Sequence, residues 1–427
     1  MEELDLVVVG GGLSGLTAAY YAAKAGLSVL VLERGDVAGS KNLSGGRIYL
    51  GPLRGLVNEL LEGLCTERKV VVERLSAVVK DGSATLSFRN SGLELPHCES
   101  HTVLRAKLDR HLAQRVAEVG GFVVPQKRVD SLIKEGDRVV GIRSDGEEIR
   151  ARGVILAEGV LGLLSKELGL YSPPRSSEVA TAIKEVIRLP EGAVESRFGV
   201  GPGEGVAHLF VGEVTQGAAG GGFLYTNRDT VSLGLVLKMD ALLEAQARPH
   251  ELLESFKARE EIAPLIAGGE TVEFGAHMIP EARRIPLGSL AGNGYLVVGD
   301  AAGLCLNMGA TVRGMDMAMA SGFFAARAMI QGQQRRDFSA SCLSSYVQFL
   351  KESFVCRDME TFRPVEGFLA SPRLYKEYPE FLCEALVRIF RVGPGPKESY
   401  SRSLRRAWVK APAVISVLRD LWRMRRF

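Results

Sequence analysis

The chain has 427 residues, a mass of 46.1 kDa and a formal net charge of +3, with 46% hydrophobic and 24% charged residues. This composition excludes a disordered or fibrous protein, and the length exceeds one ordinary hydrophobic core, so we expect two closely connected domains. The six cysteines include no CxxC pair and no spacing typical of zinc or iron–sulfur ligation. We therefore predict reduced thiols and no metal site.

The N-terminus predicts an intracellular protein. Residues 1–5 lead straight into a strand, with no basic region and no cleavable apolar segment, so export is not expected. The longest apolar stretch, residues 295–330, is interrupted by Asp300, Arg313 and Asp316. These charges disfavour a helix that crosses a membrane.

The first motif is LVVVGGGLSG at residues 6–15, which predicts a buried parallel strand followed by a nucleotide-binding turn. Gly10 permits the tight turn, Gly12 lets a pyrophosphate approach the backbone, and Gly15 lets the next helix pack closely on the strand. The N-terminus of that helix offers free N–H groups and a favourable dipole to the diphosphate.

The elements that follow complete this pattern. A helix rich in alanine is predicted at residues 16–25, ending at Gly26, and a second strand at residues 28–32. Glu33 comes at the end of that strand, where an acid accepts hydrogen bonds from the adenosine ribose. Strand, helix, strand and acid together predict a dinucleotide site.

The next segment favours FAD over NAD. A simple NAD dehydrogenase would continue with further alternating strands and helices, whereas residues 39–51 read GSKNLSGGRIYLG and contain four glycines. Such a loop predicts backbone lying against a flat ring system.

A second junction between a strand and a glycine, YLVVGDAAG at residues 295–303, explains how the long FAD molecule would be held at both ends. Asp300 is placed to bond the ribityl hydroxyls. The chain is predicted to become helical after Arg313 and Gly314, and the helix N-terminus near residues 309–314 would stabilise negative charge on the reduced flavin.

The spacing of the strands and helices predicts four segments. They are an FAD-binding domain at residues 1–171 and 291–335, an inserted and mostly antiparallel sheet at residues 172–290, and a helical region at residues 336–427 that is interrupted by a loop at 372–380. Within the sheet, Phe223 and Tyr225 are expected either in the core or facing the flavin. The alternatives for His277 are a structural role and a proton relay. Lys41 and Arg47 are expected to contact the flavin or a partner.

The C-terminal tail concentrates the positive charge. Residues 402–427 carry eight Lys or Arg and one Asp, a net charge of +7, which leaves −4 for the rest of the chain. Both tryptophans, Trp408 and Trp422, lie in this tail among apolar residues. The pattern fits a segment on a membrane surface and equally a helix docked on the protein or a subunit.

These motifs together resemble the flavoprotein family that contains the FixC proteins, electron transfer flavoprotein–quinone oxidoreductases and geranylgeranyl reductases, and they are most similar to FixC. The similarity covers nearly the whole chain. It rests on GGGLSG (10–15), GSKNLSGGRIY (39–49), VLRAKLDRHLA (103–113), LAEGV (156–160), AIKEVIRLP (182–190), GGGFLYTNRDTVSLGLV (220–236), AHMIPEA (276–282), GDAAG (299–303) and SFVCRDM (353–359).

The resemblance implies an α/β (α+β) fold, with a Rossmann-like FAD-binding domain of the glutathione-reductase and aromatic-hydroxylase type, an inserted antiparallel sheet and a helical C-terminal region. It implies an FAD-dependent electron-transfer subunit that passes electrons from an electron transfer flavoprotein (FixA and FixB, or EtfB and EtfA) to a quinone. The setting it implies is a bifurcating FixABCX (EtfABCX) complex. From the N-terminus and the basic tail we expect the protein in the cytoplasm, peripherally associated with the cytoplasmic membrane. A separate ferredoxin-like subunit, FixX (EtfX), would supply the iron–sulfur cluster.

No catalytic side chain and no nucleic-acid partner are expected, because the flavin itself carries out the chemistry. The first alternative is a flavoprotein of the geranylgeranyl reductase type, which would reduce double bonds of isoprenoid lipids. An aromatic hydroxylase and an FAD-binding assembly subunit without a redox role are further alternatives.

The resemblance also implies specific cofactor contacts. Arg105 would approach the cofactor, Asp109 would stabilise the segment that carries it, and Val129 would contact the adenine through its backbone. Relatives often have Asp where this chain has Glu158, so a longer acid must be accommodated there. The residues expected to bind FAD are Gly10, Gly12, Leu13, Ser14, Gly15, Glu33, Arg34, Asn42, Ser44, Gly45, Gly46, Arg105, Val129, Ala157, Glu158, Gly159, Gly299, Asp300, Gly309, Ala310 and Thr311.

Overall fold

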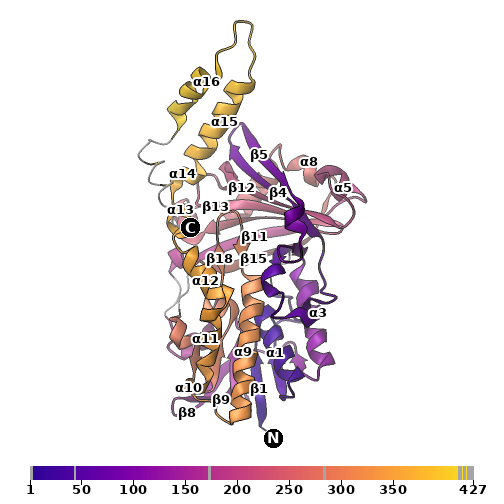
Figure 1. Cartoon of the computed structure of the whole chain (residues 1–427), viewed down its shortest axis with the longest axis vertical. Coiled ribbons are helices and arrows are strands. Elements are labelled where there is room, and N and C mark those ends of the chain that lie inside the picture. The colour runs from indigo at the N-terminus through magenta and orange to yellow at the C-terminus, as the bar shows by residue number, and fades with distance from the viewer. Residues whose placement is uncertain are drawn as a thin grey trace.

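The computed structural model describes residues 3–42, 45–171, 175–281 and 285–411, together with residues 416 and 420. Two sheets dominate this part of the chain (Figure 1), and a group of C-terminal helices runs alongside them and ends in a projecting helical pair. The mixed α/β architecture agrees with the predicted fold class.

The first sheet has eight strands, and its parallel core is buried on both faces, as apolar runs such as Leu4–Val9 predict. Along the sheet the strands are β16 (Ala291–Gly292), β17 (Tyr295–Val297), β10 (Glu147–Leu156), β1 (Leu4–Val9), β2 (Val29–Leu32) and β7 (Phe122–Val124), with β9 (Arg138–Ser144) and β8 (Val129–Glu135) attached through β10. In register, Val9 pairs with both Leu32 and Leu156, and Leu156 pairs with Val297. Four parallel strands therefore end at one edge of the sheet.

Helices α1 (Leu13–Lys24), α3 (Arg105–Glu118) and α9 (Met315–Arg335) pack around this sheet (Figure 1). Small residues allow α1 and α9 to touch: a Cβ atom on Gly322 would lie 2.1 Å from the Ser14 carbonyl oxygen. The helix expected after Arg313 and Gly314 is α9, and the helix expected at residues 16–25 is α1, which begins three residues earlier than predicted. Two short helices, α2 (Asn58–Leu61) and α4 (Leu163–Glu167), lie in the connections.

The second sheet has nine strands and is antiparallel except where β12 pairs with β4. Its strands are β15 (Glu270–Pro280), β11 (Val179–Arg188), β14 (Thr230–Lys238), β13 (Gly220–Thr226), β12 (Glu204–Gly212), β4 (Lys69–Val79), β6 (Ser100–Val103) and β3 (Gly46–Tyr49), with β5 (Gly82–Arg89) paired to β4. The structure thus extends this sheet beyond the predicted range 172–290, since four of its strands come from residues 46–103. Short apolar runs indicate strands but not the partners with which they pair, which is why the sequence pattern did not reveal this.

One face of the second sheet carries its own hydrophobic core, which includes Leu233, Leu235 and Phe256. Four helices accompany this sheet: α5 (Ala193–Phe198), α6 (Met239–Glu244), α7 (Pro249–Lys257) and α8 (Ala263–Ile266). The other face of the sheet is therefore available to the first domain.

The C-terminal region is helical, as predicted, and it follows a small hairpin of β18 (Leu306–Asn307) and β19 (Val312–Arg313) and the helix α9. Its helices are α10 (Ala340–Leu343), α11 (Ser345–Glu352), α12 (Phe354–Thr361), α13 (Val365–Leu369), α14 (Pro372–Tyr375), α15 (Glu377–Phe390) and α16 (Tyr400–Ala407). Of the helices that the structure describes, none combines the length and the apolar character needed to cross a bilayer.

The prediction of a loop at residues 372–380 was wrong, because this stretch forms α14 and the start of α15. Its two prolines suggested a loop. Pro372 is the first residue of α14, and Pro379 lies in the first turn of α15, where a helix needs no intrahelical N–H donor.

The basic tail docks on these helices as far as it is described. The rings of Trp408 and Phe381 meet edge to face, with centroids 5.4 Å apart. The buried Asp420 accepts hydrogen bonds from Arg373 Nε at 2.9 Å and from the Tyr378 hydroxyl at 2.8 Å. Trp422 lies outside the described residues.

Candidate functional site

The candidate site lies at the edge of the first sheet where β2, β1, β10 and β17 end side by side. The turn after β1 is sterically tight: Gly10 has φ +108°, and a Cβ atom there would lie 2.3 Å from the Ala157 carbonyl oxygen. A Cβ atom on Gly15 would lie 2.1 Å from the Gly10 carbonyl oxygen. Only glycine fits at both positions, so the chain turns sharply and brings α1 against the strands.

The N-terminus of α1 is built to face an anion. Gly12 is its N-cap residue, no side chain caps it, and no acid stands in the first turn, where Leu13 and Ser14 are buried. The first N–H groups of a helix lack intrahelical partners and attract negative charge. A Cβ atom on Gly12 would still lie 3.9 Å from Arg105 Nη2 and 4.0 Å from Asn42 Nδ2, so space remains beside the turn.

Arg105 is held beside this turn by Asp109, which also accepts a hydrogen bond from Asn42. Its Nε donates to Asp109 Oδ1 at 2.9 Å and its Nη2 to Asp109 Oδ2 at 2.8 Å, while Asn42 Nδ2 donates to Asp109 Oδ2 at 2.5 Å. Burial lowers the pKa of Arg105, but the charges of Asp109 and Asp300 outweigh it and raise the pKa above its usual range. The guanidinium is thus a fixed positive charge between the two predicted junctions.

Glu33, at the end of β2, contacts the glycine turn that follows β1. Its carboxylate accepts hydrogen bonds from the Gly11 N–H at 2.8 Å and the Gly35 N–H at 2.6 Å. A carboxylate has about four acceptor positions, so a ribose contact remains available and stays a prediction. The neighbouring Arg34 side chain is exposed.

Val129 begins β8 and pairs with Ser144 of β9. The segment just before it approaches the Glu33 turn, because the Lys127 N–H donates to the Glu33 carbonyl oxygen at 2.9 Å. This position lies near the adenosine end of the expected cofactor, and the backbone contact of Val129 with the adenine stays a prediction.

The Glu158 carboxylate has partners within the chain, and its contact with the cofactor stays a prediction. One carboxylate oxygen accepts from the Leu164 N–H at 2.7 Å, and the other accepts from the Ser165 N–H at 2.8 Å and the Ser165 hydroxyl at 2.6 Å. The acid therefore caps the N-terminus of α4. Its neighbour Ala157 lies at the end of β10 beside Gly10, and Gly159 has φ +73°.

The second junction meets the first. Gly299 has φ +60°, its N–H donates to Ser321 Oγ at 3.0 Å, and a Cβ atom on it would lie 2.6 Å from Ser14 Oγ. Asp300 follows Gly299 and interacts electrostatically with His277 and Arg105. Burial raises the pKa of Asp300, and the charges of His277 and Arg105 offset part of this rise. Burial lowers the pKa of His277.

Gly309, Ala310 and Thr311 form the turn between β18 and β19, before the N-terminus of α9. The Met308 N–H donates to the Thr311 carbonyl oxygen at 2.9 Å, and Gly309 has φ +83°. Gly309 and Ala310 are exposed. The predicted helix N-terminus is therefore at Gly314, which has no side-chain cap.

The glycine-rich loop bridges the two domains. Of its predicted contacts, Ser44 lies outside the described residues. Gly45 has φ +76°, and a Cβ atom on it would lie 1.9 Å from Ser232 Oγ of β14, while its carbonyl oxygen accepts a hydrogen bond from Lys184 Nζ of β11. A Cβ atom on Gly46 would lie 2.7 Å from Met315 Cε, at the start of α9. The loop is thus in contact with the second sheet at Gly45 and with the start of α9 at Gly46.

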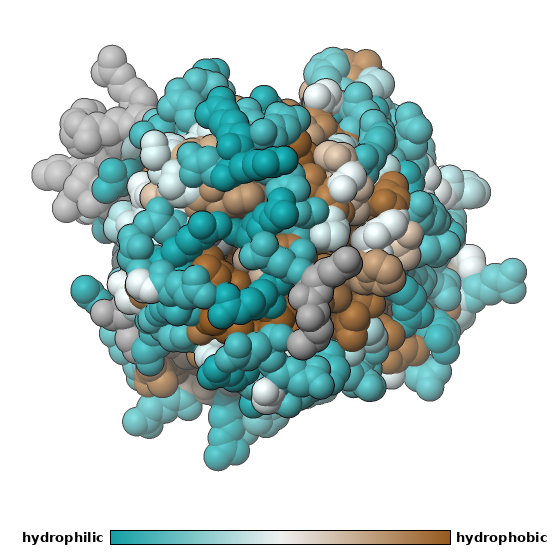
Figure 2. Space-filling model, turned by 90° about the horizontal axis from the view of Figure 1, so that it is seen from below, coloured by the Kyte–Doolittle hydropathy of each residue, from teal (hydrophilic) through white to brown (hydrophobic). Residues whose placement is uncertain are grey.

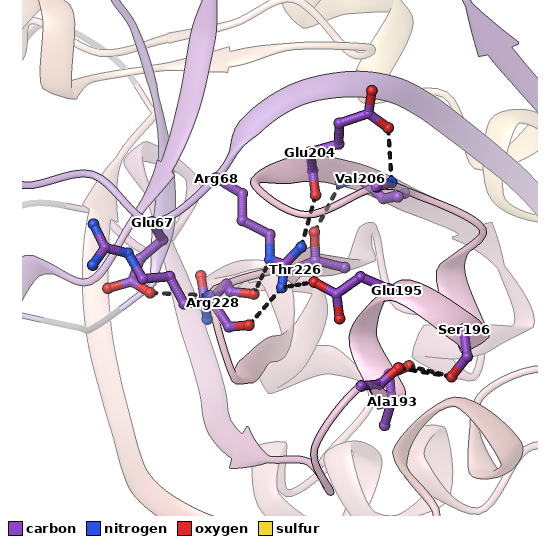
Figure 3. A network of polar contacts seen from close by, with 12 residues as sticks. Glu67, Arg68, Ala193, Glu195, Ser196, Glu204, Val206, Thr226 and Arg228 are labelled. Atoms are coloured by element: carbon purple, nitrogen blue, oxygen red, sulfur yellow. Dashed lines mark hydrogen bonds and ion pairs between the residues drawn. The ribbon is translucent and has the colours of Figure 1, made fainter.

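A polar network fixes the second sheet at this position (Figure 3). Arg68, which is buried, donates to Glu195 Oε1 at 2.6 Å and to backbone carbonyl oxygens of Asn227, Arg228 and Glu204. Glu67 accepts from the Arg228 N–H at 3.0 Å and from Lys107 Nζ at 3.0 Å. Since Lys107 is on α3, the network ties the sheet to the helix that carries Arg105.

Comparisons with known proteins agree with this geometry. A family model described as FAD dependent oxidoreductase matches residues 5–92, one described as ETF-QO, ubiquinone-binding matches residues 180–279, and one described as ETF-QO/FixC family C-terminal domain matches residues 365–427. The probable electron transfer flavoprotein-quinone oxidoreductase YdiS of Escherichia coli K12 is 39% identical over 419 residues, which cover 98% of this chain and 97% of YdiS. Protein FixC of the same strain is 39% identical over 420 residues, with the same coverage. The chain belongs to the ETF-QO/FixC family.

Solved structures similar to this FixC-family protein share its fold. A geranylgeranyl bacteriochlorophyll reductase-like protein of Thermoplasma acidophilum matches with a TM-score of 0.73 and 23% identity over 99% of this chain and 100% of its own. The myxobacterial chondrochloren halogenase CndH matches with a TM-score of 0.65 and 21% identity over 97% of this chain and 99% of its own.

The FixC-family protein is an FAD-dependent oxidoreductase, and its site fits FAD. The uncapped N-terminus of α1, with the open side of Gly12, suits the diphosphate, and Asp300 at the end of β17 suits the polyol that leads to the ring. When bound, FAD supplies the redox chemistry. The residues described above would bind it and would set the charge around it.

Several residues at this site were missed by the sequence prediction. Lys184 and Ser232 lie in segments that resemble FixC, yet no local sequence pattern links them to the glycine-rich loop that contains Gly45 (the Gly45 loop). Arg47 pairs with Glu73 of β4, its Nη1 donating to Glu73 Oε2 at 2.9 Å, and its contact with the flavin or a partner stays a prediction. Phe223 is buried beside Lys184, with Lys184 Nζ 5.9 Å from its ring centroid.

Proposed function

We propose that this FixC-family protein accepts electrons from an electron transfer flavoprotein and passes them through FAD to a quinone. The observation that carries the proposal is the position of the second sheet. Residues 180–279, matched by the model described as ubiquinone-binding, include β11, whose Lys184 donates a hydrogen bond to the Gly45 loop at the cofactor site. A quinone bound against this sheet would reach the flavin ring. The names of YdiS and FixC add support.

The residues would act by binding and by charge. The N-terminus of α1 and Arg105 would hold the diphosphate, and Glu33 would orient the adenosine end. The N-terminus of α9 would stabilise negative charge on the ring. His277 and Lys184 are on the neighbouring strands β15 and β11, and we infer that a quinone would approach the flavin from their side of the sheet.

The setting we propose is a complex with FixA-like and FixB-like subunits and a ferredoxin-like FixX subunit, in which electron bifurcation takes place. The support is the similarity over 98% of the chain to proteins named FixC. Tagged protein purified from its own host should carry these subunits with it. Purification of the chain alone, from cells that express all of them, would contradict this part of the proposal.

We further propose that the protein binds a membrane surface through the end formed by β5, α15 and α16. These elements lie together at one end of the molecule (Figure 1). They and the residues next to them carry exposed apolar side chains, among them Leu86, Phe88, Val387, Phe390 and Val392. The contact between Cys383 Sγ and the Ala77 carbonyl oxygen, at 3.8 Å, joins α15 to the β4–β5 hairpin. Exposed Arg391, Arg402 and Arg405 lie on the same helical pair. Apolar side chains flanked by arginines favour binding to anionic lipid.

The opposite end of the molecule provides the control for this proposal. Figure 2 views that end and shows a mainly hydrophilic surface with apolar residues visible between the polar ones. Phe390 is 78% exposed at the tip of α15, and Phe122 is 70% exposed on β7 of the first sheet. Phe390→Asp should therefore weaken sedimentation with anionic vesicles of phosphatidylglycerol, whereas Phe122→Asp should not. Equal sedimentation of both variants and the parent would contradict membrane binding at this end.

The electron-transfer proposal is tested without oxygen. The purified protein is mixed with a reduced electron transfer flavoprotein while the absorbance of its bound FAD is followed, and a menaquinone analogue is then added. We expect bleaching by the flavoprotein and recovery with the quinone. Absence of bleaching, together with turnover of a geranylgeranyl lipid under chemical reduction, would overturn the proposal in favour of a lipid reductase.

A further inference from the structure

Lys184 lies in an unusual place for a lysine. It is in the middle of β11, only 4% exposed, between Gly234 of β14 and Gly275 of β15 in the sheet register. Its side chain projects from the face of the sheet that meets the first domain, where its Nζ donates to the Gly45 carbonyl oxygen. A long charged side chain is almost never buried to this degree without a partner charge.

The ammonium has unused hydrogen-bonding capacity. An ammonium has three N–H donors, and among the described residues Lys184 has one acceptor, Gly45, and no ion pair within 4.0 Å. The charged and titratable groups that face it are Arg105 of α3 and Glu273 and His277 of β15. Burial and the charge of Arg105 lower the pKa of Lys184 to about 7, and Glu273 offsets this only in part.

The position of Lys184 relative to the cofactor follows from its neighbours. Gly45 and Gly46 lie between Ser232 of the second sheet and Met315 at the N-terminus of α9. Arg105, which acts on Lys184, lies beside Gly12, and His277 interacts with both Lys184 and Asp300. The Lys184 amine therefore interacts electrostatically with residues that lie at both glycine junctions.

We propose that Lys184 is a redox-linked proton-binding residue of the FAD site, which takes up a proton when the flavin is reduced and releases it when the flavin is reoxidised. Reduction brings two electrons from the donor to the flavin, and the amine at Nζ becomes an ammonium with a proton from solvent. Reoxidation sends the two electrons to the acceptor and returns this proton.

The physical reason is the change of charge at the site. Reduction adds negative charge near the buried amine, and an opposite charge nearby favours the charged form. The inference rests on FAD binding alone and not on the proposed donor or acceptor. It can therefore be tested with a chemical reductant, so that its failure is separate from a failure of the proposed function.

The test is the dependence of the FAD midpoint potential on pH. It is measured by spectroelectrochemical titration with dithionite and mediators between about pH 5.5 and about pH 9. For a two-electron couple each proton taken up adds about 30 mV per pH unit to the slope. Above about pH 7.5 the parent protein should show a slope steeper by about 30 mV per pH unit than Lys184→Met. Below about pH 6 the two slopes should coincide, because Lys184 would then be protonated in both redox states.

Two further variants make the result specific. Lys184→Arg keeps a fixed positive charge, so its slope should equal that of Lys184→Met while its potential lies higher at every pH. Lys257, on α7, contacts β11 from the opposite face through Glu185, with Nζ 3.0 Å from Oε2. Lys257→Met is the matched control and should keep the slope of the parent protein.

Equal slopes of the parent protein and Lys184→Met at pH 8 would overturn the proposal. If Lys184→Met fails to bind FAD, Lys184→Arg is tested in its place. A slope of Lys184→Arg equal to that of the parent protein would likewise contradict the proposal. Proton uptake per two electrons, followed with an indicator dye in weak buffer, gives a second readout. At pH 8 it should be one proton greater in the parent protein than in either variant.

Discussion

Ser14 and Gly299 lie against each other, although 285 residues separate them in the chain. Ser14 is in the first turn of α1, and Gly299 follows β17, two strands away from β1 in the sheet. The contact is close enough that a Cβ atom on Gly299 would lie 2.6 Å from Ser14 Oγ. The two glycine junctions of the sequence are thus two walls of one site, joined where the diphosphate and the polyol of FAD would meet.

Gly299→Ala should weaken FAD binding, because the new methyl group would displace Ser14 and the residue has φ +60°. Placing alanine in a left-handed conformation costs about 1 kcal/mol, and the steric conflict adds to this. Gly26→Ala is a fitting control, since Gly26 has φ +89° but no atom within 4 Å of a Cβ position. In a fluorescence titration, we expect the FAD dissociation constant of Gly299→Ala to rise at least about tenfold above that of Gly26→Ala, or about 1.4 kcal/mol. Similar constants would contradict this account.

Glu33→Gln should destabilise the turn that faces the adenosine. The carboxylate accepts from the Gly11 and Gly35 N–H groups, and the amide end of glutamine would confront one of them with another donor. A buried group left without its partner costs about 1–3 kcal/mol. We expect a loss of this size in urea unfolding of the FAD-free protein. Asp145→Asn, which removes an exposed carboxylate 2.7 Å from Lys127, should change stability little.

Arg68→Met should lower the free energy of unfolding far more than Arg89→Met. Arg68 is 4% exposed and pairs with Glu195 at 2.6 Å, whereas Arg89 is 49% exposed and pairs with Glu204 at the same distance. Arg68 also donates to three backbone carbonyl oxygens, and each buried group left without its partner costs about 1–3 kcal/mol, whereas an exposed pair contributes about 0–1 kcal/mol. Chemical denaturation of both variants measures the difference. Equal losses would show that the network of Figure 3 does not hold the second sheet in place.

The sequence predicted the parts of the site that are encoded locally. The order of strand, glycine turn, helix, strand and acid from Leu6 to Glu33 specifies a nucleotide site, because each element follows the last within a few residues. The second junction was predicted for the same reason, as Asp300 follows a short buried strand directly.

The remaining parts depend on pairing between distant segments. Lys184 reaches Gly45 only because β11 lies in a sheet that also contains β3, and no periodicity reveals that pairing. Glu158 was predicted as a cofactor contact, and the sequence did not reveal that its carboxylate accepts a hydrogen bond at the start of α4, five residues later. In both cases tertiary packing decides what a polar side chain does.

His208 should make the protein sensitive to acid. It is 5% exposed in β12, its Nε2 lies 2.7 Å from Ser76 Oγ, and its ring stacks on Phe210 with centroids 3.9 Å apart. Burial, with a contribution from the charge of Arg74, lowers the pKa of His208 to about 3. The unfolded chain has an ordinary histidine pKa of about 6.5, so between these values it binds a proton that the folded state does not. Stability from this residue is therefore complete above about pH 6.5 and is lost as the pH falls toward 3.

His208→Gln should remove this dependence, because glutamine can replace the bond to Ser76 without titrating. The free energy of unfolding in urea is measured at pH 6.5 and at pH 4.5 for both proteins. Each pH unit in this window contributes up to about 1.4 kcal/mol, so the decrease on acidification should be about 2–3 kcal/mol smaller in the variant. His250→Gln, at a histidine that is 62% exposed, should leave the decrease unchanged. A variant that keeps the decrease of the parent protein would mean that acid acts on groups other than His208.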